Sequence, residues 1–143
     1  MDKNALTMIG RLIVLCFIFF LVPVQAIAQS TLTIIIKELR NSQGHVLLQV
    51  FDENQKLIKE ASQSIENENC VVRFVNLETG KYAFKYFHDE NDDLDLNTNW
   101  VGIPKEGFGF SNNAKAIFGP PAFIKWVFEV SGDLEIISSP QYF

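Results

Sequence analysis

Apolar and polar residues alternate along most of the chain after residue 30, and this two-residue period predicts β-strands. The first two alternating runs are residues 31–39 and 45–52. Their apolar positions are Leu32, Ile34, Ile36, Val46, Leu48 and Val50. Because the stretch 41–44 (Asn-Ser-Gln-Gly) between the runs is a turn signal, they are predicted to form a hairpin.

Four more strands are predicted further along, at residues 70–77, 81–89 and 122–130 and from residue 134 onward. In the second of these, His88 shares a face with Tyr82, Phe84 and Tyr86. In the third, Ile124, Trp126, Phe128 and Val130 are expected to face the core. The polar stretch 53–69 has no such period, which predicts a loop or a single helical turn around Leu57 to Ala61.

Strands of this length, separated by turns and without long helices, are typical of an antiparallel two-sheet β-sandwich of about seven strands, as in immunoglobulin-like domains. The segment 102–121 interrupts this pattern with repeated glycines and prolines. It is long for a connection inside a small domain, so it is a candidate binding segment. Phe108 and Phe110 within it either form an exposed aromatic lip or fold back to plug the end of the sandwich, and the plug is favoured.

The N-terminal region has the features of a signal peptide. Lys3 and Arg11 precede an apolar run over residues 12–24, and the run is followed by the small residues Ala26 and Ala28. The run is short for a membrane span, so residues 1–28 are predicted to be cleaved, although an uncleaved anchor is the alternative. The mature chain, residues 29–143, is then a single domain that is secreted or periplasmic and not inserted in a membrane.

The charge and cysteine content restrict the partners and the redox chemistry. The chain has 17 acidic and 12 basic residues, and cleavage after residue 28 removes Asp2, Lys3 and Arg11, which leaves a net charge of −6. Nucleic-acid binding is therefore not expected. Cys70 is the single cysteine of the mature chain, so no internal disulfide forms, and we expect a buried thiol. We expect a monomer that binds an envelope protein or a glycan.

The stretch 88–99 (HDENDDLDLNTN) contains most of the candidate functional side chains of the sequence. Oxygen-bearing side chains recur there at every second position, at Asp89, Asn91, Asp93, Asp95 and Asn97. Calcium and similar hard cations take six to eight oxygen ligands, and a curled loop with this spacing can supply several of them. Leu94 and Trp100 stand where an EF-hand needs glycine and glutamate, so Glu90 or Glu106 is needed to complete the shell. The predicted hard-cation site consists of Asp89, Asn91, Asp93, Asp95, Asn97 and Glu106.

Other interpretations of this stretch remain open. A solvated acidic turn in a plain interaction module needs no ion. His88 with Glu106 could act as the acid–base pair of a small hydrolase. The sequence contains no nucleophile motif, and the mature chain is short for a domain with a saccharide cleft. An enzyme is therefore not favoured. His88, at the end of a buried face, is expected to pack and to hydrogen-bond. The favoured hypothesis is a non-enzymatic module with calcium as the candidate ion.

Three stretches resemble those of a known family: the turn at 76–83 (NLETGKYA), HDEN at 88–91 followed by the Asp/Asn-rich turn, and 99–113 (NWVGIPKEGFGFSNN) with Gly119-Pro120-Pro121. Together they are similar to the bacterial domain of unknown function 2141. The resemblance covers nearly the whole mature chain and implies an exported sandwich similar to prealbumin-like, surface-associated modules. Asp93-Leu94 stands where the family commonly has Asn-Gly, and Asn97 where it has Asp. Leu94 in place of that glycine puts the tight turn in question, because a left-handed conformation costs leucine about 1 kcal/mol or more.

Overall fold

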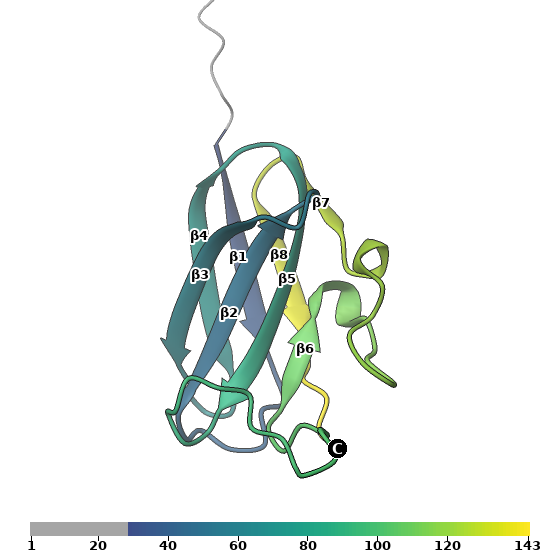
Figure 1. Cartoon of the computed structure of the whole chain (residues 1–143). Coiled ribbons are helices and arrows are strands. Elements are labelled where there is room, and N and C mark those ends of the chain that lie inside the picture. Colours follow the sequence, from purple (N-terminus) through teal and green to yellow (C-terminus); the bar gives the residue numbers. More distant parts are fainter. Residues whose placement is uncertain (1–28) are drawn as a thin grey trace, which may run out of the picture.

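Two β-sheets packed face to face form residues 29–143, the part of the chain that this computed structural model describes (Figure 1). The predicted signal peptide, residues 1–28, lies outside the described residues. One sheet has the strand order β4-β1-β8, and the other has the order β3-β2-β5-β6 with β7 also paired to β5. All pairs are antiparallel except β1 with β8. The predicted two-sheet sandwich is confirmed, with eight strands.

The strands are β1 (Ser30–Ile36), β2 (His45–Asp52), β3 (Leu57–Ser64), β4 (Cys70–Leu77), β5 (Gly80–Asp89), β6 (Phe108–Phe110), β7 (Phe128–Val130) and β8 (Leu134–Ser138). Two single turns of 3₁₀ helix, η1 (Ser111–Asn113) and η2 (Phe123–Lys125), complete the secondary structure of the described part. Within residues 29–143 there is no helix of the length and apolarity that a membrane crossing requires.

The core lies between the sheets and follows directly from the alternating pattern. Every second residue of β1 and β2 is fully buried, and burying each such aliphatic side chain contributes about 1.5–3 kcal/mol. Phe84 and Tyr86 of β5 fill the centre of this core. Cys70 at the start of β4 is buried as expected, and this burial raises the pKa of its thiol to about 11.

The predicted hairpin of the first two runs is wrong. β1 pairs with β4 and β8, whereas β2 pairs with β3 and β5, so residues 37–44 cross from one sheet to the other. Because each strand has one apolar face, placing β1 and β2 in opposite sheets lets the two faces cover one another across the core. Leu39 is buried within the connection, which fixes it as an inter-sheet crossing.

The prediction of a loop or helical turn at 53–69 is also wrong, because residues 57–64 form β3. This strand lies at the edge of the five-stranded sheet and is exposed along nearly its whole length. An edge strand held by backbone bonds to one neighbour needs no apolar face, so its sequence lacks the alternation that marks the other strands. Asp52 starts the turn into it by accepting the backbone N–H groups of Asn54 and Lys56 at 2.9 Å each.

The predicted strand at 122–130 is only partly formed. Residues 128–130 are β7, but Phe123–Lys125 is a 3₁₀ turn and Ile124 is exposed rather than buried. Trp126 is buried as expected, in a second apolar cluster on the outer face of the five-stranded sheet. The cluster consists of Ala83, Phe108, Phe110, Ala116 and Trp126. The segment 111–127, which lies beside β6 and β7, therefore covers part of this outer face (Figure 1).

Candidate functional site

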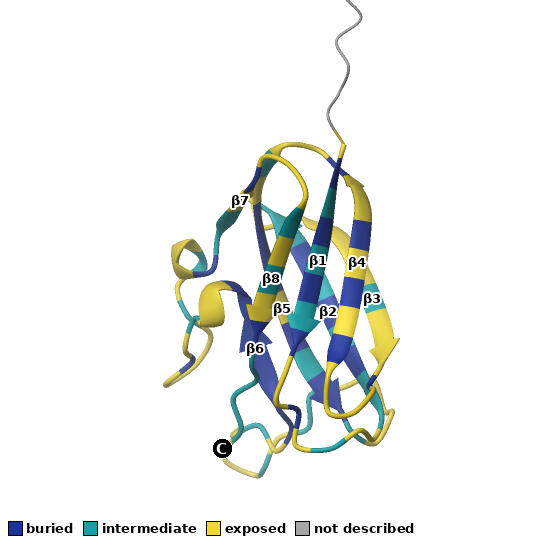
Figure 2. Cartoon of the chain, turned by 180° about the vertical axis from the view of Figure 1, so that it is seen from behind, coloured by how far each residue is buried: buried dark blue, intermediate teal, exposed yellow. Residues whose placement is uncertain are grey.

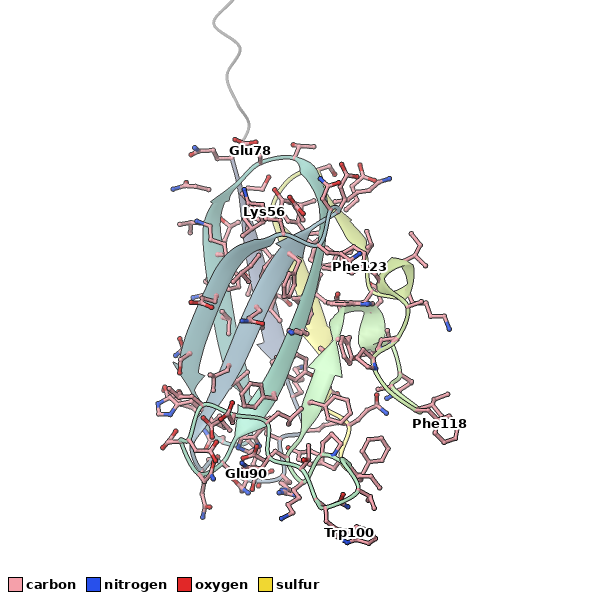
Figure 3. The ribbon with its side chains drawn as sticks, viewed as in Figure 1. Lys56, Glu78, Glu90, Trp100, Phe118 and Phe123 are labelled. Carbon is pink, nitrogen blue, oxygen red and sulfur yellow. The ribbon has the colours of Figure 1, made fainter. Side chains whose placement is uncertain are left out.

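The acidic stretch begins at the last residue of β5 and leads into β6, at the end of the sandwich where the 37–44 crossing also lies (Figures 1 and 3). Asp89, in β5, is fully buried. Its carboxylate accepts the backbone N–H groups of Asp93 at 3.2 Å and Leu94 at 2.9 Å. The first predicted cation ligand therefore caps the turn that follows it, as a side chain caps the start of a helix.

Glu106 is the second buried carboxylate of the loop. Its Oε1 accepts the backbone N–H of Glu90 at 3.0 Å, and its Oε2 accepts that of Asn97 at 2.9 Å. One side chain thus ties the beginning of the acidic loop to its end. Bonds from backbone N–H groups to a carboxylate are charge-assisted and are stronger than neutral ones.

Asn91, Asp93 and Asn97 converge, as the cation hypothesis expects. Asp93 Oδ2 accepts the side-chain amides of Asn91 and Asn97 at 2.8 Å each, and Asn91 Nδ2 also lies 3.0 Å from Asn97 Oδ1. Hydrogen bonds from the Asn97 amide, the Asp95 backbone and the Asn91 amide lower the pKa of Asp93 below 3.8.

The six predicted ligands therefore separate into three groups: Asp89 and Glu106 hold backbone N–H groups, Asn91, Asp93 and Asn97 hold one another, and Asp95 is exposed. In residues 29–143 no three His, Cys, Asp or Glu side chains are grouped so that they could hold a metal ion. The acidic loop is ordered by its own hydrogen bonds.

Arg40 fastens the loop to the crossing between the sheets, a role that was not predicted from the sequence. Its Nη2 lies 2.6 Å from Glu90 Oε1 and donates to the carbonyl oxygen of Lys105 at 3.0 Å. Its guanidinium also stacks on the ring of Tyr142, 4.9 Å from the centroid. These partners come from distant parts of the chain, so a local motif cannot reveal the contact.

His88 is fully buried and hydrogen-bonded, as expected. Its Nε2 donates to the carbonyl oxygen of Gln43 at 2.8 Å, since a carbonyl can only accept. Its Nδ1 lies 3.1 Å from the Tyr142 hydroxyl, with which it shares a hydrogen bond. Both ring nitrogens are engaged, and Glu106 is not among the hydrogen-bond partners of His88 in the described chain. An open acid–base pair is therefore not formed.

Gly44 is required where the crossing meets the acidic loop. Its φ is +67°, and a Cβ there would overlap the carbonyl group of Asp89. Gly109 is required for a similar reason, since a Cβ would overlap the Tyr86 ring. The glycines of the sequence thus permit two close approaches that position the loop and β6.

Leu94 and Leu96 extend from the acidic loop over the outer face of the five-stranded sheet. They help to enclose a trough of about 490 Å³, whose floor is a cross-strand row of Leu47, Phe87 and Phe108. The next row, Glu60, Gln49 and Lys85, gives the trough a polar side. Leu94 has φ +67°, so the left-handed turn position forms even though leucine replaces the family's glycine.

A second hollow, of about 610 Å³, lies between residues 96–104 and 116–120. We refer to it as the loop groove. Phe108 and Phe110 are buried and help to line it, which confirms that these rings fold back. Trp100 and Phe118 near its two sides are 95% and 104% exposed, and both project away from the body of the molecule (Figure 3). The exposed aromatic lip that was the alternative for Phe108 and Phe110 is therefore not formed by these two residues.

By its fold the protein is a two-sheet β-sandwich domain, with an internally hydrogen-bonded acidic loop and an apolar groove beside that loop. Residues 34–138 match the model of a family described as an uncharacterized protein conserved in bacteria, DUF2141, so the chain belongs to this family. The resemblance found in the sequence is confirmed. A search of curated proteins found no match.

Proposed function

We propose that this chain is an exported, non-enzymatic binding module of the cell envelope, and that its loop groove holds an apolar segment of another envelope protein. The observation that carries the proposal is the chemistry of the groove. Its lining, within the described chain, is free of charged side chains: Leu96, Thr98, Val101, Gly102, Ile103, Pro104, Phe108, Phe110, Ala116, Ile117, Phe118, Gly119, Pro120 and Phe143.

The exposed residues around the groove favour a protein partner. Trp100, Ile117 and Phe118 are all largely exposed, and contiguous exposed apolar surface marks interaction sites. Aromatic side chains dominate the binding energy of protein interfaces. A glycan site needs several polar groups beside its aromatic platform, whereas Thr98 supplies the one side-chain hydroxyl of the lining. The acidic net charge of the chain disfavours an anionic lipid surface.

The non-enzymatic part of the proposal rests on the positions of the candidate catalytic groups. Burial of His88 and its bonds to Gln43 and Tyr142 keep it away from solvent. A general base must reach the proton that it removes, directly or through one water. The carboxylate of Glu106 is likewise committed to two backbone N–H groups.

Photocrosslinking in the exporting cell tests the groove. A benzophenone side chain introduced at position 118 of the full chain is expected to give one discrete protein adduct. The same group at position 58, on β3 and outside the groove, serves as the control. The adduct should disappear in Ile103→Asp, which places a charge inside the groove, and persist in Ile58→Asp. Both variants should unfold at the same temperature as the parent, since both positions are exposed.

Two results would overturn this proposal. The first is an adduct at position 118 that contains lipid or glycan and no protein. The second is a protein adduct that survives Ile103→Asp unchanged, because the captured protein would then not occupy the groove.

A second candidate function, calcium binding, is favoured by one observation. The side chains of Asn91, Asp93 and Asn97 already converge, with the two amide nitrogens on the Asp93 carboxylate, and rotation of the two amides would turn their oxygens inward. A ligand that binds only the folded state raises its stability, by about 2.7 kcal/mol at a concentration of 100 Kd. We expect calcium to raise the melting temperature relative to chelator, and Asp93→Ala to abolish the difference.

The matched control for the calcium experiment is Asp133→Ala, which removes a carboxylate outside the acidic loop. It should retain the calcium response. Equal melting temperatures of the parent chain in calcium and in chelator would exclude the ion at millimolar concentration. Asp89 is unsuitable for this test, because its carboxylate holds the backbone of the loop.

A further inference from the structure

The outer face of the three-stranded sheet is apolar at one end and charged in the middle. Burial alternates along β1 and β4 between buried and less buried residues, and along most of β8 between intermediate and exposed ones (Figure 2). We infer from this period that each strand turns every second side chain outward. The pairing register places Val71, Ile35 and Ile137 in one row across the strands. Val71 and Ile137 are 41% and 50% exposed.

The neighbouring row contains two opposite charges. Arg73 on β4 and Glu135 on β8 flank Thr33 on β1. Both are exposed, and neither takes part in an ion pair within residues 29–143. The face is therefore positive on its β4 side, negative on its β8 side and apolar in the adjacent row.

We propose that this face binds a second copy of the same chain, through a two-fold axis that runs along β1 between the two sheets. Such an axis exchanges the β4 side of one copy with the β8 side of the other and preserves the position along the strand. Arg73 of each copy then faces Glu135 of the other. Val71 faces Ile137, and Ile35 and Thr33 each face their own equivalents. An isologous contact requires this self-complementarity.

The geometry fits the known packing of sheets. Two sheets stack about 10 Å apart with their strands within about 30° of one another. An axis parallel to the strands gives such an aligned arrangement. Each of the three strands contributes only a few outward residues to the face, and interfaces much smaller than about 800 Å² per partner are weak or transient. The dimer is therefore reversible and depends on concentration.

The loop groove is built on the five-stranded sheet and its covering segment, so the dimer leaves it open. The axis along β1 also keeps the strand direction, so both copies present their acidic loops at the same end of the dimer. The inference does not depend on the function proposed for the groove, and each can fail without the other.

Sedimentation equilibrium of the purified mature protein, residues 29–143, tests the dimer. The parent chain should show a reversible monomer–dimer equilibrium. Arg73→Glu and Glu135→Arg should each weaken the dimer about tenfold or more, because each places like charges opposite one another. The double variant, with both charges reversed, should restore the parent affinity to within about threefold, since the pairing is re-formed in the opposite sense.

The control is Lys59→Glu, which makes the same charge change on β3 of the other sheet and should leave the equilibrium unaltered. All these side chains are exposed, so the variants are expected to retain the parent circular dichroism spectrum. A parent chain that stays monomeric up to about 1 mM overturns the inference and agrees with the monomer expected from the sequence. A double variant that remains as weak as the single ones also overturns it.

Discussion

Asp89 and Glu106 place buried carboxylates where most loops place water or backbone carbonyls. Each accepts two backbone N–H groups of the acidic loop. A buried N–H without a partner costs about 1–3 kcal/mol, so these carboxylates stabilise the loop by accepting its N–H groups. This explains why a loop with so many like charges is nonetheless well ordered. The acidic character of the stretch is thus partly a requirement of its backbone.

The exposed carboxylate of Asp93 makes the loop sensitive to acid. Its pKa is lowered, first by the Asn97 amide, so the ionised form favours the folded loop. This contribution is fully present above the ordinary pKa of 3.8 and is lost as the pH falls through the lower folded value. In an NMR titration, the side-chain amide signals of Asn91 and Asn97 should move with a midpoint below pH 3.8. In Asn97→Ala the Asn91 midpoint should rise, and a parent midpoint at or above 3.8 would contradict the contact.

Leu94 is strained, because a left-handed conformation costs a residue with a Cβ about 1–2 kcal/mol. Its side chain is 67% exposed, so little packing offsets that cost. Leu94→Gly should therefore raise the free energy of unfolding by about 0.5–1 kcal/mol, after the greater freedom of glycine in the unfolded chain is counted. Urea denaturation measures the change. The control, Leu96→Gly, lacks a positive φ to relieve and should destabilise the fold; a loss in both variants would show that Leu94 is not strained.

At the scale of elements, the sequence predicted strands wherever one face was buried and the other was not. The strands at 70–77 and 81–89 and the last strand were found for this reason. β3 was missed because it is exposed on both faces, so burial imposes no period on its sequence. The error at 31–52 was one of pairing, since alternation identifies a buried face but does not say which sheet carries the strand.

The acidic loop behaves as one element, because Glu106 joins its two ends. Glu106→Gln replaces one accepting oxygen with a donor that faces a backbone N–H. This should lower the free energy of unfolding by about 1–3 kcal/mol, as measured by urea denaturation. Asp95→Asn makes the same chemical change at an exposed carboxylate that accepts no hydrogen bond in the described chain, and it should change stability by less than about 0.5 kcal/mol. Equal effects of the two substitutions would show that Glu106 does not tie the loop.

At the scale of the whole molecule, the candidate site depends on contacts that local patterns do not contain. The convergence of Asn91, Asp93 and Asn97 was predicted from their spacing. The anchoring of the loop by Arg40 and Tyr142 was not, because those residues are 102 positions apart and meet only when both sheets are assembled. The loop groove likewise combines residues 96–120 with Phe143.

The proposed export of the chain depends on its first 28 residues, which the sequence analysis interprets as a signal peptide. We expect signal peptidase to cleave after Ala28, since small residues occupy positions 26 and 28. Intact-mass analysis of the protein recovered from the periplasm or medium should give a chain that begins at Gln29. Ala26→Arg with Ala28→Arg should leave the leader attached, whereas Gln25→Asn should be processed normally. A mature N-terminus elsewhere, or full-length protein in the cytoplasm, would contradict this expectation.

The parallel pairing of β1 with β8 determines where a label or a fusion can be attached. Since the first and last strands run the same way, the chain enters the sandwich at one pole and leaves it at the other (Figure 1). The leaving end brings Phe143 against the loop groove. A fluorescent protein or an affinity tag attached directly after Phe143 is therefore expected to obstruct the groove, whereas one inserted directly before Ser30 sits at the far pole. Binding assays and surface immobilisation should use the N-terminal side.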